Sequence, residues 1–280
     1  MRYWELGLAA LLIAGIGPLS RPATAQGVIR DGGLESVVRK YVYDKRDNQE
    51  PLTEGDLAPI TRIVGQGKGI RDLSGLEQCQ RLAVLDLEKN EINDLTPLRG
   101  LKNLQSLNLA KNHMTDLTAL AGLSNLEYLQ LSDNQIQDLS PLAKLTKLRS
   151  LYLSNNRIQD LTPLAGLGEL RSLYLDGNQV RELAALARLT RLETLDARAN
   201  RIVDLAPLRN VSAFKYLLLD GNQVTSIQVL VEMAQRSGDG TRRSAPAWQI
   251  SLTGNPLDLA ARGTQLETLR RAVKSVTFER

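Results

Sequence analysis

The sequence has almost none of the residues from which disulfides, metal sites and nucleophilic catalysts are usually built. Among 280 residues it holds one cysteine, Cys79, and one histidine, His113. A single cysteine excludes a disulfide within the chain. A lone histidine lacks the partners that a zinc site or a nucleophile–base pair requires. The sequence also has no G-x-S-x-G, P-loop or H-E-x-x-H motif, so we predict a non-enzymatic protein without metal or cofactor.

Long hydrophobic runs are also missing, apart from one short run at the N-terminus. Leu6–Ile16 is apolar, and Ala23–Ala25 fits a small-x-small cleavage site. This pattern predicts a secretory signal peptide over residues 1–25 and a mature chain without a transmembrane segment. An uncleaved anchor is the alternative, but the run is short for a membrane span. We expect an exported protein, periplasmic or secreted, and the lack of disulfides favours a bacterial source.

What the sequence does contain is a repeat of 22 residues. The pattern is L-x-x-L-x-L-x-x-N-x-[IVM]-x-[DE]-L-x-x-L. It starts at Leu82, Leu104, Leu126, Leu148, Leu170, Leu192 and Phe214. A fixed period of this length and spacing is typical of a leucine-rich repeat solenoid. We therefore predict an α/β fold with a curved parallel sheet on the concave side, short 3₁₀ or α turns on the convex side, and a helical cap at each end.

Two polar residues recur in every repeat and are best explained by the scaffold. The asparagine at Asn90, Asn112, Asn134 and their later equivalents is predicted to form a buried ladder that satisfies backbone groups. The acid at Asp94, Asp116 and their equivalents precedes a turn and is expected to cap it. A row of carboxylates could also suggest calcium, but calcium needs several oxygens at one point.

The repeat register divides the chain. We predict an N-terminal helical cap over 26–59, with helical spacing from Leu34 to Asp47 and a helix start at Thr53. Repeats follow over 60–257: a degenerate unit 60–81, regular units 82–213, and irregular units 214–257 with an inserted loop 236–246. A C-terminal cap over 258–280 completes the division. In the degenerate unit Cys79 takes a leucine position, so it is expected to be a small buried hydrophobe. Helices are expected at Ile227–Gln235 and Thr264–Lys274, and a strand at Trp248–Leu252.

The candidate functional residues are those that vary while the leucines stay fixed. Alternating strand side chains place these residues on the concave face. The predicted partner-binding residues are Tyr128, Tyr152, Tyr174, Tyr216, Leu218, Asp176, Asp196, Arg198 and Asp220. Exposed tyrosine clusters are common in interfaces, although tyrosine also simply suits strands. Arg242 and Arg243 in the inserted loop are a possible secondary contact.

The cations outside this face do not suggest nucleic acid. The net charge of +4 is mild. Lys and Arg are expected on turns and the convex side, at Arg99, Lys102, Lys144, Lys147, Arg188 and Arg191. A nucleic-acid site needs a continuous basic stripe, and we predict none, so no nucleic-acid partner is expected.

The repeat L-Q-S-L-N-L-A-K-N-H-M-T-D-L-T-A-L-A-G-L-S-N from Leu104 resembles the internalin-like class of bacterial leucine-rich repeats. The preceding helical segment and the entry G-K-G-I-R-D-L-S-G-L (Gly67–Leu76) look like that family's N-terminal cap. The resemblance implies a concave face that binds a receptor protein. The sequence shows no following immunoglobulin-like domain and no L-P-x-T-G segment, so we expect a free periplasmic or secreted binder.

The leading hypothesis is a monomeric protein-interaction module that binds a partner protein or peptide on its concave face. One alternative is a glycan or cell-wall binder that uses the same tyrosines as stacking platforms. The other is a structural or inhibitor protein that makes contact through its C-terminal insertion. The sequence does not name the partner.

Overall fold

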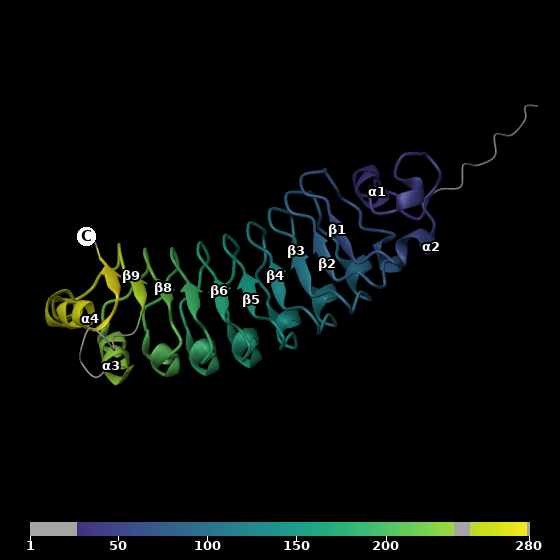
Figure 1. Cartoon of the computed structure of the whole chain (residues 1–280). Coiled ribbons are helices and arrows are strands. Elements are labelled where there is room, and N and C mark those ends of the chain that lie inside the picture. The colour runs from purple at the N-terminus through teal and green to yellow at the C-terminus, as the bar shows by residue number, and fades with distance from the viewer. Residues whose placement is uncertain (1–26, 238–246, 279–280) are drawn as a thin grey trace, which may run out of the picture.

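The computed structural model describes residues 27–237 and 247–278, which build one curved sheet of ten parallel strands (Figure 1). The strands follow one another in chain order and each has three residues: β1 Arg62–Val64, β2 Val84–Asp86, β3 Ser106–Asn108, β4 Tyr128–Gln130, β5 Ser150–Tyr152, β6 Ser172–Tyr174, β7 Thr194–Asp196, β8 Tyr216–Leu218, β9 Gln249–Ser251 and β10 Ser275–Thr277. The predicted fold class, a leucine-rich repeat solenoid with the sheet on its concave side, is confirmed.

Each rung of the solenoid returns through a short helix on the side opposite the sheet. These 3₁₀ helices are η2 Leu76–Gln78, η3 Thr96–Leu98, η4 Thr118–Leu120, η5 Ser140–Leu142, η6 Thr162–Gly166, η7 Ala184–Arg188 and η8 Ala206–Asn210. The middle residue of every strand from β2 to β7 is a fully buried leucine, as are the consensus leucines of the helices. One rung cannot bury these side chains alone, so the core is continuous through the stack.

The repeated asparagines form the predicted ladder inside the turn that follows each strand. Asn156 is typical: its Nδ2 donates to the carbonyls of Leu131 and Leu153, both at 3.0 Å. Its Oδ1 accepts the N–H of Ile136 at 3.0 Å. The amide thus joins two successive rungs, and Asn90 through Asn255 repeat the arrangement, each at most 9% exposed.

The repeated aspartates close local turns just before the 3₁₀ helices. The carboxylates of Asp94, Asp116, Asp138 and Asp160 each accept the backbone N–H two residues later at 2.8 Å. Hydrogen bonds to the following Thr or Ser lower the pKa of all four below the usual range. The described residues contain no cluster of three or more metal-ligating side chains, and the turns alone account for this acidic row.

Helices close both ends of the stack (Figure 1). At the N-terminal end lie α1 Gly32–Arg39, the 3₁₀ turn η1 Tyr43–Lys45 and α2 Glu54–Leu57, whose Thr53 and Asp56 form a capping box. The Tyr41 hydroxyl accepts the outward N–H of Val64 at 3.0 Å, which satisfies a polar group at the edge of β1.

The C-terminal end is formed by α3 Gln228–Ser237, the π-helical turn η9 Ala261–Gln265 and α4 Leu266–Ala272. Helix α3 continues two residues into the segment predicted as an exposed loop. The last rung also holds β10, a strand that the sequence did not predict because S-V-T lacks the leucine pattern.

Five rungs place a residue other than glycine in the left-handed region at the same turn position: Lys89, Lys111, Asp133, Asn155 and Ala199. Ala199 has φ of 50°, whereas its equivalents Gly177 and Gly221 have φ of 68° and 64°. The left-handed region costs a residue with a Cβ roughly 1–2 kcal/mol, and the Ala199 side chain is exposed. We expect Ala199→Gly to raise the free energy of unfolding by about 0.5–1 kcal/mol, measured by urea denaturation. The matched change Ala187→Gly, inside η7, should lower it by a similar amount; a stabilising effect of both would contradict the strain argument.

Candidate binding surface

The strand register aligns the variable residues into rows that cross the sheet. Tyr128, Ser150, Ser172, Thr194 and Tyr216 form one row, because each is paired with the next. Gln130, Tyr152, Tyr174, Asp196 and Leu218 form the second row. The structure therefore places all four predicted tyrosines on the same face of the sheet, between β4 and β8.

Three of the tyrosines form a continuous aromatic ladder. The rings of Tyr152 and Tyr174 stack with centroids 4.5 Å apart and an interplanar angle of 6°. Tyr128 contacts Tyr152 from the other side, at 5.3 Å and 46°. Tyr174 on β6 therefore covers one ring face of Tyr152, and the tilted ring of Tyr128 on β4 contacts it as well. The ladder presents mainly ring edges and hydroxyl groups toward the concave space.

The hydroxyl groups of the ladder are free to bind. Within residues 27–237 and 247–278, no protein group donates to or accepts from the hydroxyls of Tyr128, Tyr152, Tyr174 or Tyr216 in a hydrogen bond. Burial raises the pKa of Tyr128 and Tyr174 above the usual range, so both remain neutral hydrogen-bond donors at physiological pH. Tyr216 is 43% exposed and has no ring contact with the ladder.

Beside the ladder, β7 carries an ion pair that fixes an arginine. Asp196 is 2% exposed. Arg198 covers it with two hydrogen bonds, from Nε at 2.8 Å and from Nη2 at 2.6 Å. These hydrogen bonds raise the pKa of Arg198 further. Asp196 is therefore a support for Arg198, and only Arg198, about half exposed, presents a charge outward.

Two further carboxylates flank Arg198 on the neighbouring rungs. Asp176 accepts a hydrogen bond from the Ser154 hydroxyl, and Asp220 accepts bonds from the Ser251 hydroxyl and the Thr253 N–H. These serines and the threonine are not among the residues predicted for the surface from the sequence. The 22-residue register does place Ser154 beside Asp176, so this pair could have been found; the Asp220 contacts cross the irregular insertion and could not.

The predicted secondary contact cannot be placed on this surface. Arg242 and Arg243 lie outside the described residues. Leu218 lies on β8 in the same row as Tyr174, on the far side of Asp196. His113 is exposed and Cys79 is fully buried, as expected.

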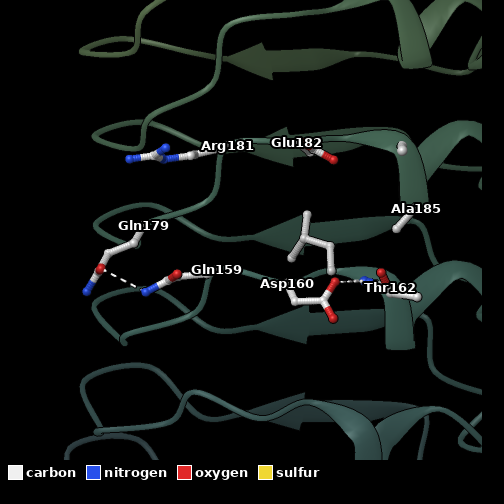
Figure 2. A pocket seen from close by; sticks show the side chains of 9 residues that line it. Gln159, Asp160, Thr162, Gln179, Arg181, Glu182 and Ala185 are labelled. Carbon is white, nitrogen blue, oxygen red and sulfur yellow. Dashed lines mark hydrogen bonds between the residues drawn. The ribbon is translucent and has the colours of Figure 1, made fainter.

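The lateral side of the solenoid has a shallow pocket of about 300 Å³ between two rungs (Figure 2). Figure 2 shows Gln159 donating to Gln179 at 3.2 Å, with Asp160 held by the Thr162 N–H. The pocket is lined by scaffold turns and holds neither a histidine nor a cysteine. It offers no nucleophile–base pair, so the concave tyrosines remain the better candidate.

Comparisons with known proteins agree with the repeat architecture. A family model described as "Leucine Rich repeats (2 copies)" matches residues 80–122, 102–144 and 124–167. A second model, "Leucine rich repeat", matches residues 146–202. No curated protein sequence matches the chain. None of the helices in the described part of the chain has the length and apolarity to cross a bilayer.

Solved structures of similar fold come from bacteria and plants. Internalin C2 of Listeria monocytogenes is 28% identical with a TM-score of 0.69, and the match covers 90% of this chain and 95% of that one. The functional domain of InlJ from the same species is 22% identical, with a TM-score of 0.61 and coverage of 88% and 54%. The ectodomain of the Arabidopsis thaliana receptor kinase GASSHO1/SCHENGEN3, solved with CASPARIAN STRIP INTEGRITY FACTOR 2, is 21% identical, with a TM-score of 0.54 and coverage of 69% and 26%.

Proposed function

Because this chain is a bacterial leucine-rich repeat protein with internalin-like 22-residue repeats, we propose that it is an exported module that binds a partner protein or peptide on its concave face. Leucine-rich repeat proteins are protein-interaction modules, and proteins of this fold are typically non-enzymatic. The proposed binding surface is the aromatic ladder of Tyr128, Tyr152 and Tyr174. Arg198, Leu218 and Tyr216 extend it. Export rests on the signal-peptide pattern in residues 1–25.

The observation that carries the proposal is the set of four tyrosine hydroxyls without hydrogen-bond partners in the described structure. The strand register gathers these hydroxyls on one face of the sheet, whereas the buried ladder asparagines use their amides within the scaffold. Stacking restricts the rings of Tyr152 and Tyr174 before any partner arrives. Pre-ordered tyrosines lose little conformational entropy on binding, which is why Tyr and Arg dominate interface energetics.

The ring packing favours a protein or peptide over a glycan. A sugar ring stacks on the face of an aromatic ring, but one face each of Tyr152 and Tyr174 is already covered by the other ring. The edges and hydroxyls of the stacked pair suit backbone amides and side chains of a polypeptide. Glycan binding by the same tyrosines is the second candidate, and Tyr216, which has no ring contact, would be its stacking platform.

The test compares capture of proteins from the envelope of the source bacterium by the tagged full chain and by its variants. Tyr152→Ala combined with Tyr174→Ala should reduce capture of the wild-type partner at least tenfold, because interface tyrosines often contribute about 2 kcal/mol each. Tyr43→Ala is the matched control, since Tyr43 is 77% exposed on the N-terminal cap. Circular dichroism verifies that each variant is folded.

Two outcomes would reject the concave site. Equal capture by the double variant and the wild type would show that the ladder does not bind. Loss of capture after deletion of residues 238–246, with concave variants unaffected, would favour contact through the C-terminal insertion. Binding to a glycan array that no envelope protein competes with would support the glycan alternative.

A further inference from the structure

The charges of the solenoid are separated between its sides, although the whole chain carries only +4. The concave face is formed by the residues of β1 to β8 and by the second residue after each of these strands. Together they include two cations and five carboxylates, a net charge of −3. One lateral side is formed by the seven segments that follow the strands, the first 67–73 and the last 199–205. Its charges nearly cancel, with seven cations and nine carboxylates. The opposite lateral side is strongly positive.

We call this positive region the basic side and define it by the segments that lead from each 3₁₀ helix into the next strand: 77–83, 99–105, 121–127, 143–149, 165–171, 187–193 and 209–215. It holds eleven cations and only four carboxylates, a net charge of +7. Consecutive segments are stacked like the strands, about 4.8 Å apart, so the basic side extends over roughly 30 Å.

Ion pairs on the basic side leave most of its cations unneutralised. Arg149 pairs with Glu127, Arg191 with Glu169, and Arg171 and Lys215 share Glu193. Seven exposed cations have no carboxylate within 4 Å in the described structure: Arg81, Arg99, Lys102, Lys144, Lys147, Arg188 and Arg209. Like charges crowded on a rigid scaffold repel one another, so an anionic surface would relieve this repulsion.

The shape of this side indicates which anionic partner it fits. The rungs stack in a gentle arc (Figure 1), and an arc is curved on its inner and outer faces but flat on its lateral sides. A flat surface with spread cations fits a flat, diffuse anionic surface. The only aromatic residue of the seven segments, Phe214, is 3% exposed, so no ring can stack on the bases of a nucleic acid. The leucines of these segments are buried as well, so attraction is electrostatic without insertion.

The geometry points to the basic side as a docking surface for an anionic phospholipid bilayer. The protein lies on its side on the lipid headgroups, with the Lys and Arg side chains toward the phosphates. In this orientation the concave face opens parallel to the membrane, and the tyrosine ladder stays accessible. The inference does not depend on the partner-binding role of the tyrosines.

The test measures sedimentation of the full chain with vesicles of phosphatidylglycerol and phosphatidylcholine in equal parts, and with phosphatidylcholine alone. We expect binding only to the anionic vesicles at about 50 mM salt, and its loss when salt rises several-fold. The triple variant Arg99→Gln, Lys102→Gln, Lys144→Gln should lower the partition coefficient on the order of tenfold.

The matched control is Arg157→Gln, Arg181→Gln, Arg201→Gln, which removes the same charge from the opposite lateral side. It should change the partition coefficient less than about twofold, with thermal unfolding midpoints of both variants close to that of the wild type. Equal losses in both variants would overturn the docking surface, because binding would then follow net charge alone. Tighter, variant-sensitive binding to duplex DNA or heparin than to vesicles would also overturn it and assign the basic side to a polyanion.

Discussion

Replacement of Asn156 by alanine is expected to lower the free energy of unfolding by about 4 kcal/mol, because it leaves one buried backbone N–H unpaired and removes further buried hydrogen bonds between two rungs. The N–H of Ile136 loses its acceptor. The carbonyls of Leu131 and Leu153 each lose one of two donors and keep the amides of Asn134 and Asn178. Asn156 is 7% exposed and joins two rungs in the middle of the stack. Water cannot reach these groups without opening the interface between the rungs, so the penalty is expected to be nearly complete.

Urea denaturation followed by circular dichroism measures this effect. Asn125→Ala is the matched control: Asn125 is half-buried, donates one bond to the Lys102 carbonyl at 2.8 Å and accepts one from the Lys147 ammonium at 2.7 Å. It should cost less than about 1 kcal/mol. Asn156→Asp should cost at least as much as Asn156→Ala, because a buried carboxylate oxygen would then face the carbonyl oxygens of Leu131, Leu153 and Ser154. A cost below 1 kcal/mol for Asn156→Ala would show that the asparagine ladder does not hold the rungs together.

The asparagine ladder was predictable from the sequence because it depends only on the 22-residue repeat. Leucines every 22 residues require a neighbouring rung, and an amide at one position of each rung can only be satisfied by the rungs beside it. The same register predicted that Tyr128, Tyr152 and Tyr174 would lie on one face and that Cys79 would replace a core leucine. Those features follow from backbone periodicity, which a sequence carries directly.

The details that depend on side-chain conformation were not predictable. The register alone puts Asp196 on the concave face beside Arg198. It does not reveal that Arg198 folds back and buries Asp196 to 2% exposure. Nor does it give the parallel stacking of Tyr152 on Tyr174. The basic side was also missed: its individual cations were noted, but their separation from the nearly balanced opposite side emerges only when the segments are stacked.

Cys79 is expected to react with thiol reagents about 10³-fold more slowly in the native protein than in the unfolded chain at pH 8. The thiol is fully buried in the first rung. Burial, assisted by the negative charge of Glu77, raises its pKa from 9.0 to about 12. About one thiol in ten ionises at pH 8 in the unfolded chain, against roughly one in 10⁴ in the folded protein, and only the thiolate attacks. Alkylation with iodoacetamide, followed by mass spectrometry with and without urea, measures the ratio.

The slow alkylation of Cys79 in the folded protein also shows how the solenoid opens. Helix α2 packs on η2, which ends beside Cys79. The Thr53–Asp56 capping box holds this helix, so Thr53→Ala, at a cost of about 1 kcal/mol, should accelerate labelling roughly fivefold if the N-terminal cap opens by itself. Asn156→Ala lies several rungs away and should leave the labelling rate unchanged. Because terminal rungs contact only one neighbour, local opening is expected before global unfolding. Acceleration by Asn156→Ala on the order of 10²-fold or more would instead mean that Cys79 is exposed only when the whole stack unfolds. Fast labelling of the wild-type protein would contradict the burial of Cys79.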